Sequence, residues 1–143
     1  MSNNENSTNP ANVVESSHES GIGIITINRP RQFNALNTEV LNAINSVLDK
    51  WESCVAVQAV IFTGAGDKAF AAGADIKELS QLSPWQVVNE YPMAELYKRI
   101  ESYPKPTVAA VNGLALGGGF ELALSCDIRI ADPQSRFAFP ELD

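Results

Sequence analysis

The sequence Lys-Pro-Thr-Val-Ala-Ala-Val-Asn-Gly-Leu-Ala-Leu-Gly-Gly-Gly-Phe-Glu-Leu-Ala occupies residues 105–123 of the chain. Its apolar run 107–112 predicts a strand that is buried on both faces. Gly113 and the run 117–119 then lead into residues 120–125, which predict a helix. A buried strand that continues through glycines into a helix is typical of an α/β protein with a parallel sheet.

Strands and helices alternate on both sides of this stretch. Turn residues and hydrophobic periodicity predict a hairpin of strands 13–17 and 22–28 around Glu19-Ser20-Gly21, followed by a helix over 38–52 with Asn37 or Thr38 as N-cap. A strand over 57–63 and one or two helical turns over 76–82 come next, and a longer helix runs from Trp85 to about Tyr103 with Pro84 at its N1 position. Two short strands are predicted over 126–131 and 136–139. This order predicts a mostly parallel sheet with right-handed crossovers, and no internal repeat is visible.

Composition describes one packed domain. The 143 residues are 45% hydrophobic and 19% charged, as in ordinary globular proteins. The net charge of −7 argues against nucleic acid and anionic membranes as partners. Residues 1–12 are polar and predict a disordered tail without a targeting signal, so the expected location is the cytoplasm.

Few residues are available for metal binding or a histidine-based triad. The two cysteines, Cys54 and Cys126, lie far apart and lack the spacing of a zinc site, so we expect free thiols. His18 is the only histidine and lies in a polar stretch. The sequence therefore predicts no metal site and no histidine-dependent nucleophile.

Three glycine-rich loops are candidates for ligand binding. Residues 64–69, Gly-Ala-Gly-Asp-Lys-Ala, resemble a dinucleotide-binding loop, but the helix that this pattern requires does not follow. Residues 72–77 and Gly117-Gly118-Gly119 leave backbone N–H groups open to a ligand, and two such loops can form an oxyanion hole. The alternative is that these glycines serve only tight turns and close helix packing.

Two glutamates follow short apolar stretches. Glu121 comes after the glycine run and precedes apolar residues, and Glu141 follows Phe139-Pro140 at the end of a predicted strand. A carboxylate among apolar neighbours tends to carry a raised pKa, which suits proton transfer near neutrality. The alternative is an ordinary glutamate at a helix N-terminus and another on an exposed loop.

Four segments together resemble the crotonase superfamily, the enoyl-CoA hydratases and isomerases. They are Ile27-Asn28-Arg29-Pro30 with Asn34-Ala35-Leu36, the run 70–79 (Phe-Ala-Ala-Gly-Ala-Asp-Ile-Lys-Glu-Leu), the run 105–113, and the run 116–123 with Cys126-Asp127. The resemblance implies a spiral of ββα units, with residues 13–143 forming its N-terminal part. Members of the superfamily continue through further ββα structure and C-terminal helices, so we expect the fold to be truncated before that helical region.

The resemblance also implies roles for individual residues. The N–H groups of Ala74 and Gly118 would form the oxyanion hole, and Glu121 and Glu141 would be the catalytic pair. The coenzyme A site would be lined by Ala72, Asp75, Ile76 and Lys77, with Arg29 or Arg31 near its phosphates.

The hydratases of the superfamily carry both glutamates, here Glu121 and Glu141, so the resemblance favours an enoyl-CoA hydratase. Such an enzyme adds water syn to trans-2-enoyl-CoA, and fatty-acid β-oxidation is the default pathway. It implies an acyl-CoA substrate, no permanently bound cofactor, and the homotrimer or hexamer of full-length members. Two alternatives stay open. One is an isomerase or another CoA-thioester enzyme of the same fold, and the other is a truncated CoA-binding fragment without activity.

Overall fold

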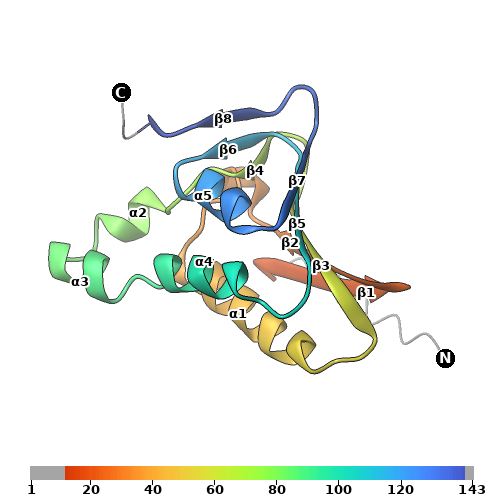
Figure 1. The fold of residues 1–143 in the computed structure, drawn as a ribbon. Helices are drawn as coiled ribbons and strands as arrows, with labels where there is room; N and C mark the ends of the chain where they lie inside the picture. The colour runs from red at the N-terminus through yellow and green to blue at the C-terminus, as the bar shows by residue number, and fades with distance from the viewer. Residues whose placement is uncertain (1–11, 141–143) are drawn as a thin grey trace.

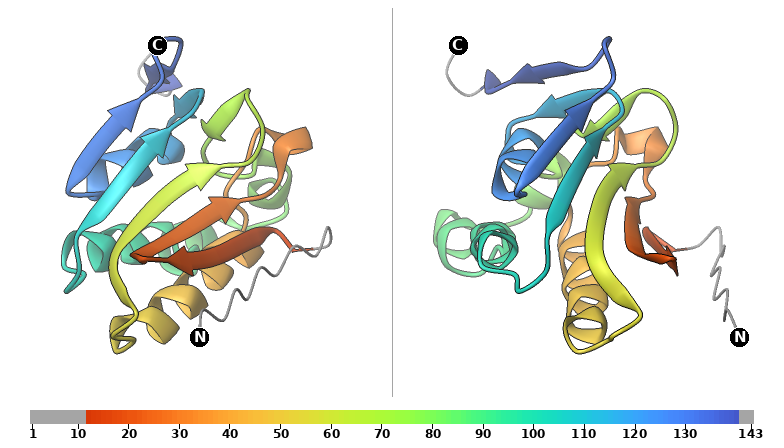
Figure 2. Two further views of the ribbon diagram at one scale, coloured as in Figure 1. Left: turned by 90° about the vertical axis from the view of Figure 1, so that its right-hand side faces the viewer. Right: turned by 45° about the vertical axis from the view of Figure 1, so that its right-hand side comes forward.

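A computed structural model describes residues 12–140 of the chain and shows two β-sheets with helices packed against them (Figure 1). The larger sheet has the order β1-β2-β3-β5-β7, formed by Val14–Glu19, Gly21–Ile27, Val57–Gly64, Thr107–Val111 and Ile128–Ala131. β1 and β2 form an antiparallel hairpin, and β2, β3, β5 and β7 run parallel (Figure 2, left). The prediction of a mostly parallel α/β sheet is confirmed.

The smaller sheet is absent from the sequence-based prediction. It contains β4 (Ala69–Ala71), β6 (Leu114–Leu116) and β8 (Arg136–Ala138), all parallel, in that order. The sequence pattern suggests that residues 70–75 continue the glycine-rich loop that begins at Gly64. This is wrong for residues 70 and 71, which belong to β4, whereas residues 72–75 lie outside the strands. The sequence pattern also does not distinguish Leu114–Leu116 as a strand, because strands of three residues are too short to show hydrophobic periodicity.

The two sheets are linked by a structural repeat. Each of the pairs β3–β4, β5–β6 and β7–β8 places its first strand in the larger sheet and its second strand in the smaller one. Helices follow the first two pairs, so the chain winds as a spiral of ββα units. The repeat lies in the backbone path, which explains why the sequence shows no internal repeat.

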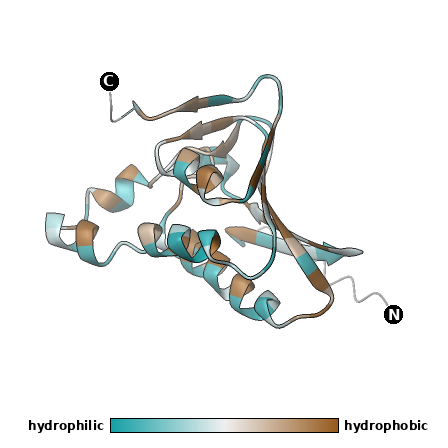
Figure 3. Ribbon diagram, viewed as in Figure 1, coloured by the Kyte–Doolittle hydropathy of each residue, from teal (hydrophilic) through white to brown (hydrophobic). Residues whose placement is uncertain are grey.

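Helices α1 (Thr38–Glu52) and α5 (Gly118–Ser125) follow the sequence pattern. The Asn37 side chain caps α1 by accepting a hydrogen bond from the Val40 N–H at 2.9 Å. Hydrophobic and hydrophilic residues alternate along α1 and α4 (Figure 3). The buried face of α1 carries the apolar residues Val40, Leu41, Ile44, Leu48 and Trp51. Within residues 12–140, no helix is long and apolar enough to cross a membrane.

The segment between β4 and β5 contains three separate helices, α2 (Ile76–Leu79), α3 (Pro84–Asn89) and α4 (Met93–Glu101). A short 3-10 helix, Pro30–Gln32, lies elsewhere, before α1. The prediction of one helix from Trp85 to Tyr103 is therefore wrong. Pro92 separates α3 from α4, because proline lacks an N–H and its ring clashes with the preceding turn. Pro84 begins α3 as predicted.

Lys105 connects the end of α1 to the larger sheet. Its ammonium group donates to the backbone carbonyl groups of Trp51, Cys54 and Val57, at 2.8 Å for Cys54 and 2.6 Å for Val57. We expect Lys105→Met to lower the free energy of unfolding by about 3 kcal/mol, because it leaves these carbonyls without a charged donor. Urea denaturation measures the change, and Lys98→Met, at an exposed position of α4, is the control and should change it by less than about 0.5 kcal/mol.

Candidate active site

Two backbone segments meet where neighbouring strands of the smaller sheet end. Gly73 and Ala74 follow β4, and Gly117 and Gly118 follow β6, the strand beside it. A Cβ atom built on Gly73 would lie 3.2 Å from the Gly118 nitrogen and 2.9 Å from the Leu116 carbonyl oxygen. The two loops that the sequence singled out are therefore side by side.

The N–H groups of Ala74 and Gly118 are both available to a ligand. Leu36 forms a parallel β-bridge with Ala74 through the residues on either side of it: the Leu36 N–H donates to the Gly73 carbonyl at 2.7 Å, and the Asp75 N–H donates to the Leu36 carbonyl at 3.4 Å. In such a bridge the N–H and C=O groups of the middle residue, here Ala74, point to the opposite side. Gly118 is the first residue of α5, where an N–H has no partner within the helix. Among the described residues, neither N–H donates a hydrogen bond to another protein atom.

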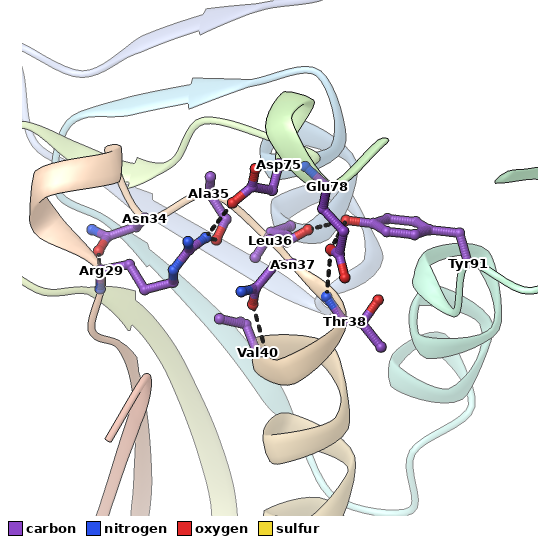
Figure 4. A network of polar contacts seen from close by, with 10 residues as sticks. All are labelled: Arg29, Asn34, Ala35, Leu36, Asn37, Thr38, Val40, Asp75, Glu78 and Tyr91. Atoms are coloured by element: carbon purple, nitrogen blue, oxygen red, sulfur yellow. Dashed lines mark hydrogen bonds and ion pairs between the residues drawn. The ribbon is translucent and has the colours of Figure 1, made fainter. Parts of the chain in front are cut away.

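An ion pair fixes the loop that carries Ala74 (Figure 4). Arg29 Nη1 donates to Asp75 Oδ2 at 2.9 Å and to the Ala35 carbonyl at 2.9 Å. Asp75 Oδ1 accepts from the Glu78 N–H at 3.2 Å and so caps α2. The Arg29 and Asp75 side chains are only 15% and 14% exposed, so both face each other inside the protein.

This arrangement distinguishes the two arginines that the sequence proposed as phosphate contacts. Arg29 is held by its ion pair, whereas Arg31 is exposed and lines a surface pocket of about 230 Å³ with Lys68. Of the other predicted coenzyme A contacts, Ala72 donates its N–H to the Phe33 carbonyl at 3.0 Å, and Ile76 and Lys77 are exposed on α2.

The ion pair predicts a dependence of stability on pH. Burial alone would raise the pKa of Asp75, but hydrogen bonds from Arg29 and the Glu78 N–H outweigh it and hold that pKa below the ordinary value. The contribution of Asp75 is therefore present above its unfolded-state pKa and lost as the pH falls through the lower folded-state pKa. We expect Asp75→Ala to lower the free energy of unfolding by about 1 to 2 kcal/mol at pH 7, and urea denaturation should show this difference shrinking towards pH 2.

Two further residues on this side were not predicted. Glu78 Oε2 accepts from the Thr38 N–H at 2.9 Å and lies 3.4 Å from the Tyr91 hydroxyl oxygen, whose single hydrogen is donated to the Leu36 carbonyl (Figure 4). Burial and the nearby Glu78 carboxylate raise the pKa of Tyr91 to about 12, so its hydroxyl stays protonated. No local sequence pattern indicates these contacts, since Tyr91 and Leu36 lie far apart in the chain.

Gly118 is enclosed by α4. The Tyr97 hydroxyl donates to the Gly118 carbonyl, and a Cβ atom on Gly118 would lie 2.6 Å from Met93 Sδ and 3.1 Å from Tyr97 Oη. Burial and the charge of Glu121 raise the pKa of Tyr97, which keeps this hydroxyl a donor. No sequence pattern indicates this role, because tyrosine on an amphipathic helix is usual.

Glu121 lies in the first turn of α5, close to the strand end that precedes Glu141. The Phe120 ring stacks on Phe139 with centroids 4.7 Å apart, and it contacts Phe137 at 5.1 Å. Phe139 and Pro140 follow β8, so these rings bring that segment beside the start of α5. Glu141 itself lies outside the described residues, as do residues 1–11 of the predicted tail.

The surroundings of Glu121 differ from the prediction. Its side chain is exposed among the described residues, whereas Leu122 and Ala123, which follow it on α5, are buried. The expectation of an apolar environment for Glu121 is therefore wrong. The physical reason is the turn of the helix, which directs successive residues to different sides.

Comparisons with known proteins identify the family of the chain. Residues 17–143 match the family model described as enoyl-CoA hydratase/isomerase. The chain belongs to this family. The short-chain-enoyl-CoA hydratase of Clostridium acetobutylicum is 45% identical over 125 residues, which cover 87% of this chain and 48% of that protein. The mitochondrial enoyl-CoA hydratase of Pongo abelii is 45% identical over 121 residues, which cover 85% of this chain and 41% of that protein.

Solved structures of the family show the same fold. The crystal structure of enoyl-CoA hydratase from Bacillus anthracis superposes with a TM-score of 0.85 at 35% identity, covering 91% of this chain and 51% of that one. The enoyl-CoA hydratase from Thermoplasma volcanium gives a TM-score of 0.85 at 34% identity, over 92% of this chain and 53% of that one. The expected crotonase-like fold is confirmed, and the chain spans about half the length of the family members it matches.

Proposed function

We propose that this chain supplies the oxyanion-binding and coenzyme A-binding part of an enoyl-CoA hydratase. The reaction is syn addition of water to trans-2-enoyl-CoA, which gives 3-hydroxyacyl-CoA. The observation that carries the proposal is the pair of N–H groups of Ala74 and Gly118, which have no partner among residues 12–140 and which adjacent loops bring together at the start of α5, the helix that carries Glu121. The family membership and the hydratases among the relatives support it.

In the proposed mechanism, the thioester carbonyl oxygen accepts hydrogen bonds from both N–H groups. Water attacks Cβ, and negative charge moves through the double bond onto that oxygen as an enolate. A pre-placed donor at such a position typically lowers the barrier by about 2.7 to 4 kcal/mol. The neutral donors suit this step because they stabilise charge without having to transfer a proton.

Two carboxylates complete the proposed chemistry. Glu121, ionised at the start, accepts a proton from the water as the water oxygen bonds to Cβ, and Glu141, protonated at the start, delivers its proton to Cα. Proton exchange with solvent then restores both carboxyl groups, so the net change is the addition of one water molecule.

For coenzyme A, we propose that the Ala72 carbonyl accepts from the adenine amine and that Ile76 lies against the nucleotide. Lys77 and Arg31 are exposed cations that favour the phosphates on a chain whose net charge is −7. Asp75 and Arg29 act mainly by holding the loop. Coenzyme A arrives and leaves as part of the substrate, so no resident cofactor is required. We keep the cytoplasm as the proposed location and a homotrimer or hexamer as the proposed assembly.

The test is to incubate the chain with crotonyl-CoA and follow loss of the conjugated enoyl-thioester absorbance, with mass spectrometry to identify 3-hydroxybutyryl-CoA. A parallel assay offers a 3-enoyl-CoA, and calorimetry measures binding of butyryl-CoA. Hydration supports the proposal. Isomerisation without hydration would replace it with an isomerase, and thioester binding without either reaction would identify a CoA-binding fragment.

A further inference from the structure

We propose that Tyr97 and Tyr91 are positioning residues that hold the two oxyanion N–H donors at their working separation. This inference rests on the proposed function, because it assigns a role to residues that support the same site. Both tyrosines come from the segment between β4 and β5, which is inserted between the two loops that carry the donors.

Each tyrosine fixes the peptide backbone beside one donor. The Tyr97 hydroxyl donates to the carbonyl of Gly118, the residue that supplies one N–H. The Tyr91 hydroxyl donates to the Leu36 carbonyl, which also accepts the Asp75 N–H directly after Ala74. The same segment therefore reaches both sides of the oxyanion hole.

Gly118 needs such support because it has no side chain of its own to restrict its backbone. The space where a side chain would lie is filled from α4 by Met93 and Tyr97, which are four residues apart and so share one face of that helix. The hydroxyl adds a directional contact that packing alone does not supply. Since the donors act only when aimed at the carbonyl oxygen, small shifts of this backbone weaken them.

The experiment compares Tyr97→Phe with Tyr103→Phe. Both variants remove a tyrosine hydroxyl that donates to a backbone carbonyl, but the Tyr103 hydroxyl donates to Leu48 at 2.7 Å, on α1. In the free protein, we expect Tyr97→Phe to shift the ¹⁵N resonance of Gly119, whose amide nitrogen is bonded to the Gly118 carbonyl carbon. Tyr103→Phe should leave that resonance in place.

The second readout is the infrared stretch of the thioester carbonyl in bound butyryl-CoA, which has no double bond to hydrate. We expect the wild-type protein to lower this frequency and Tyr97→Phe to move it back towards the free value, with Tyr103→Phe unchanged. Tyr91→Phe should act in the same direction through the Ala74 side. With crotonyl-CoA, Tyr97→Phe should lower kcat by about 10- to 100-fold with little change in KM.

The outcomes separate the two proposals. A wild-type protein that binds the thioester without lowering its stretching frequency would overturn the proposed function, and the positioning role with it. The positioning role alone would be overturned by a different result. In that case the wild-type protein lowers the carbonyl stretching frequency, folded Tyr97→Phe lowers it equally, and the Gly119 resonance does not shift.

Discussion

Replacing Gly119 by alanine is expected to lower the free energy of unfolding by more than about 4 kcal/mol. An added Cβ would lie 1.9 Å from the Ala71 carbonyl oxygen and 2.5 Å from its carbonyl carbon. Both atoms belong to the backbone of β4, so relief requires that α5 and β4 move apart. The measurement is urea denaturation followed by circular dichroism, and failure of the variant to unfold cooperatively is consistent with the same prediction.

The neighbouring Gly118→Ala is the matched control. Its added Cβ would meet the sulfur of Met93 at 2.6 Å and the Tyr97 hydroxyl oxygen at 3.1 Å. Met93 is a flexible side chain that can turn aside, and the tyrosine need move only by a few tenths of an ångström. We expect a change within about 1 kcal/mol. If Gly119→Ala kept wild-type stability, the close approach of α5 to β4 would be refuted.

Replacing Glu121 by glutamine is expected to lower kcat for crotonyl-CoA hydration by about 10³-fold, because glutamine keeps the shape of the side chain but cannot accept the proton of the attacking water. KM and the affinity for butyryl-CoA should stay near the wild-type values, since Glu121 has no proposed part in coenzyme A binding. Steady-state kinetics and calorimetry measure the two quantities separately.

Glu95→Gln is the control for this loss, because Glu95 is an exposed carboxylate in the first turn of α4. It should retain full activity. Hydration by Glu121→Gln at the wild-type rate would show that Glu121 is not the base. A loss of hydration accompanied by a loss of thioester binding would instead give Glu121 a structural role.

Periodicity and turn chemistry identified the long elements of the fold. The hairpin, α1 with its Asn37 cap, β3 and β5 were predicted within a few residues of their observed ends, because each has several apolar positions at one spacing. The resemblance supplied the spiral that periodicity did not reveal. The helix predicted over 85–103 failed at Pro92, whose effect on the backbone is local and readable from the sequence.

The site was predictable in part. The glycine loops indicated where backbone donors are exposed, and the structure brings those loops together. The contacts that hold them, such as Arg29 with Asp75 and Tyr97 with Gly118, join residues distant in the chain and leave no local pattern. Asp75 shows why a motif alone does not predict the role of a residue. The resemblance implies that Asp75 lines the coenzyme A site, but its two carboxylate oxygens bind Arg29 and cap α2.

The smaller sheet has a consequence for the distance between the proposed oxyanion donors. Ala74 and Gly118 follow adjacent strands, and backbone hydrogen bonding sets adjacent strands about 4.8 Å apart whatever side chains they carry. The strand pairing thus brings the two loops within reach of each other, and the proposed role of Tyr97 and Tyr91 is to set the final positions of the two N–H groups. Substitutions among the small apolar residues of β4 and β6 that keep the strand pairing should therefore alter stability while leaving the two loops side by side.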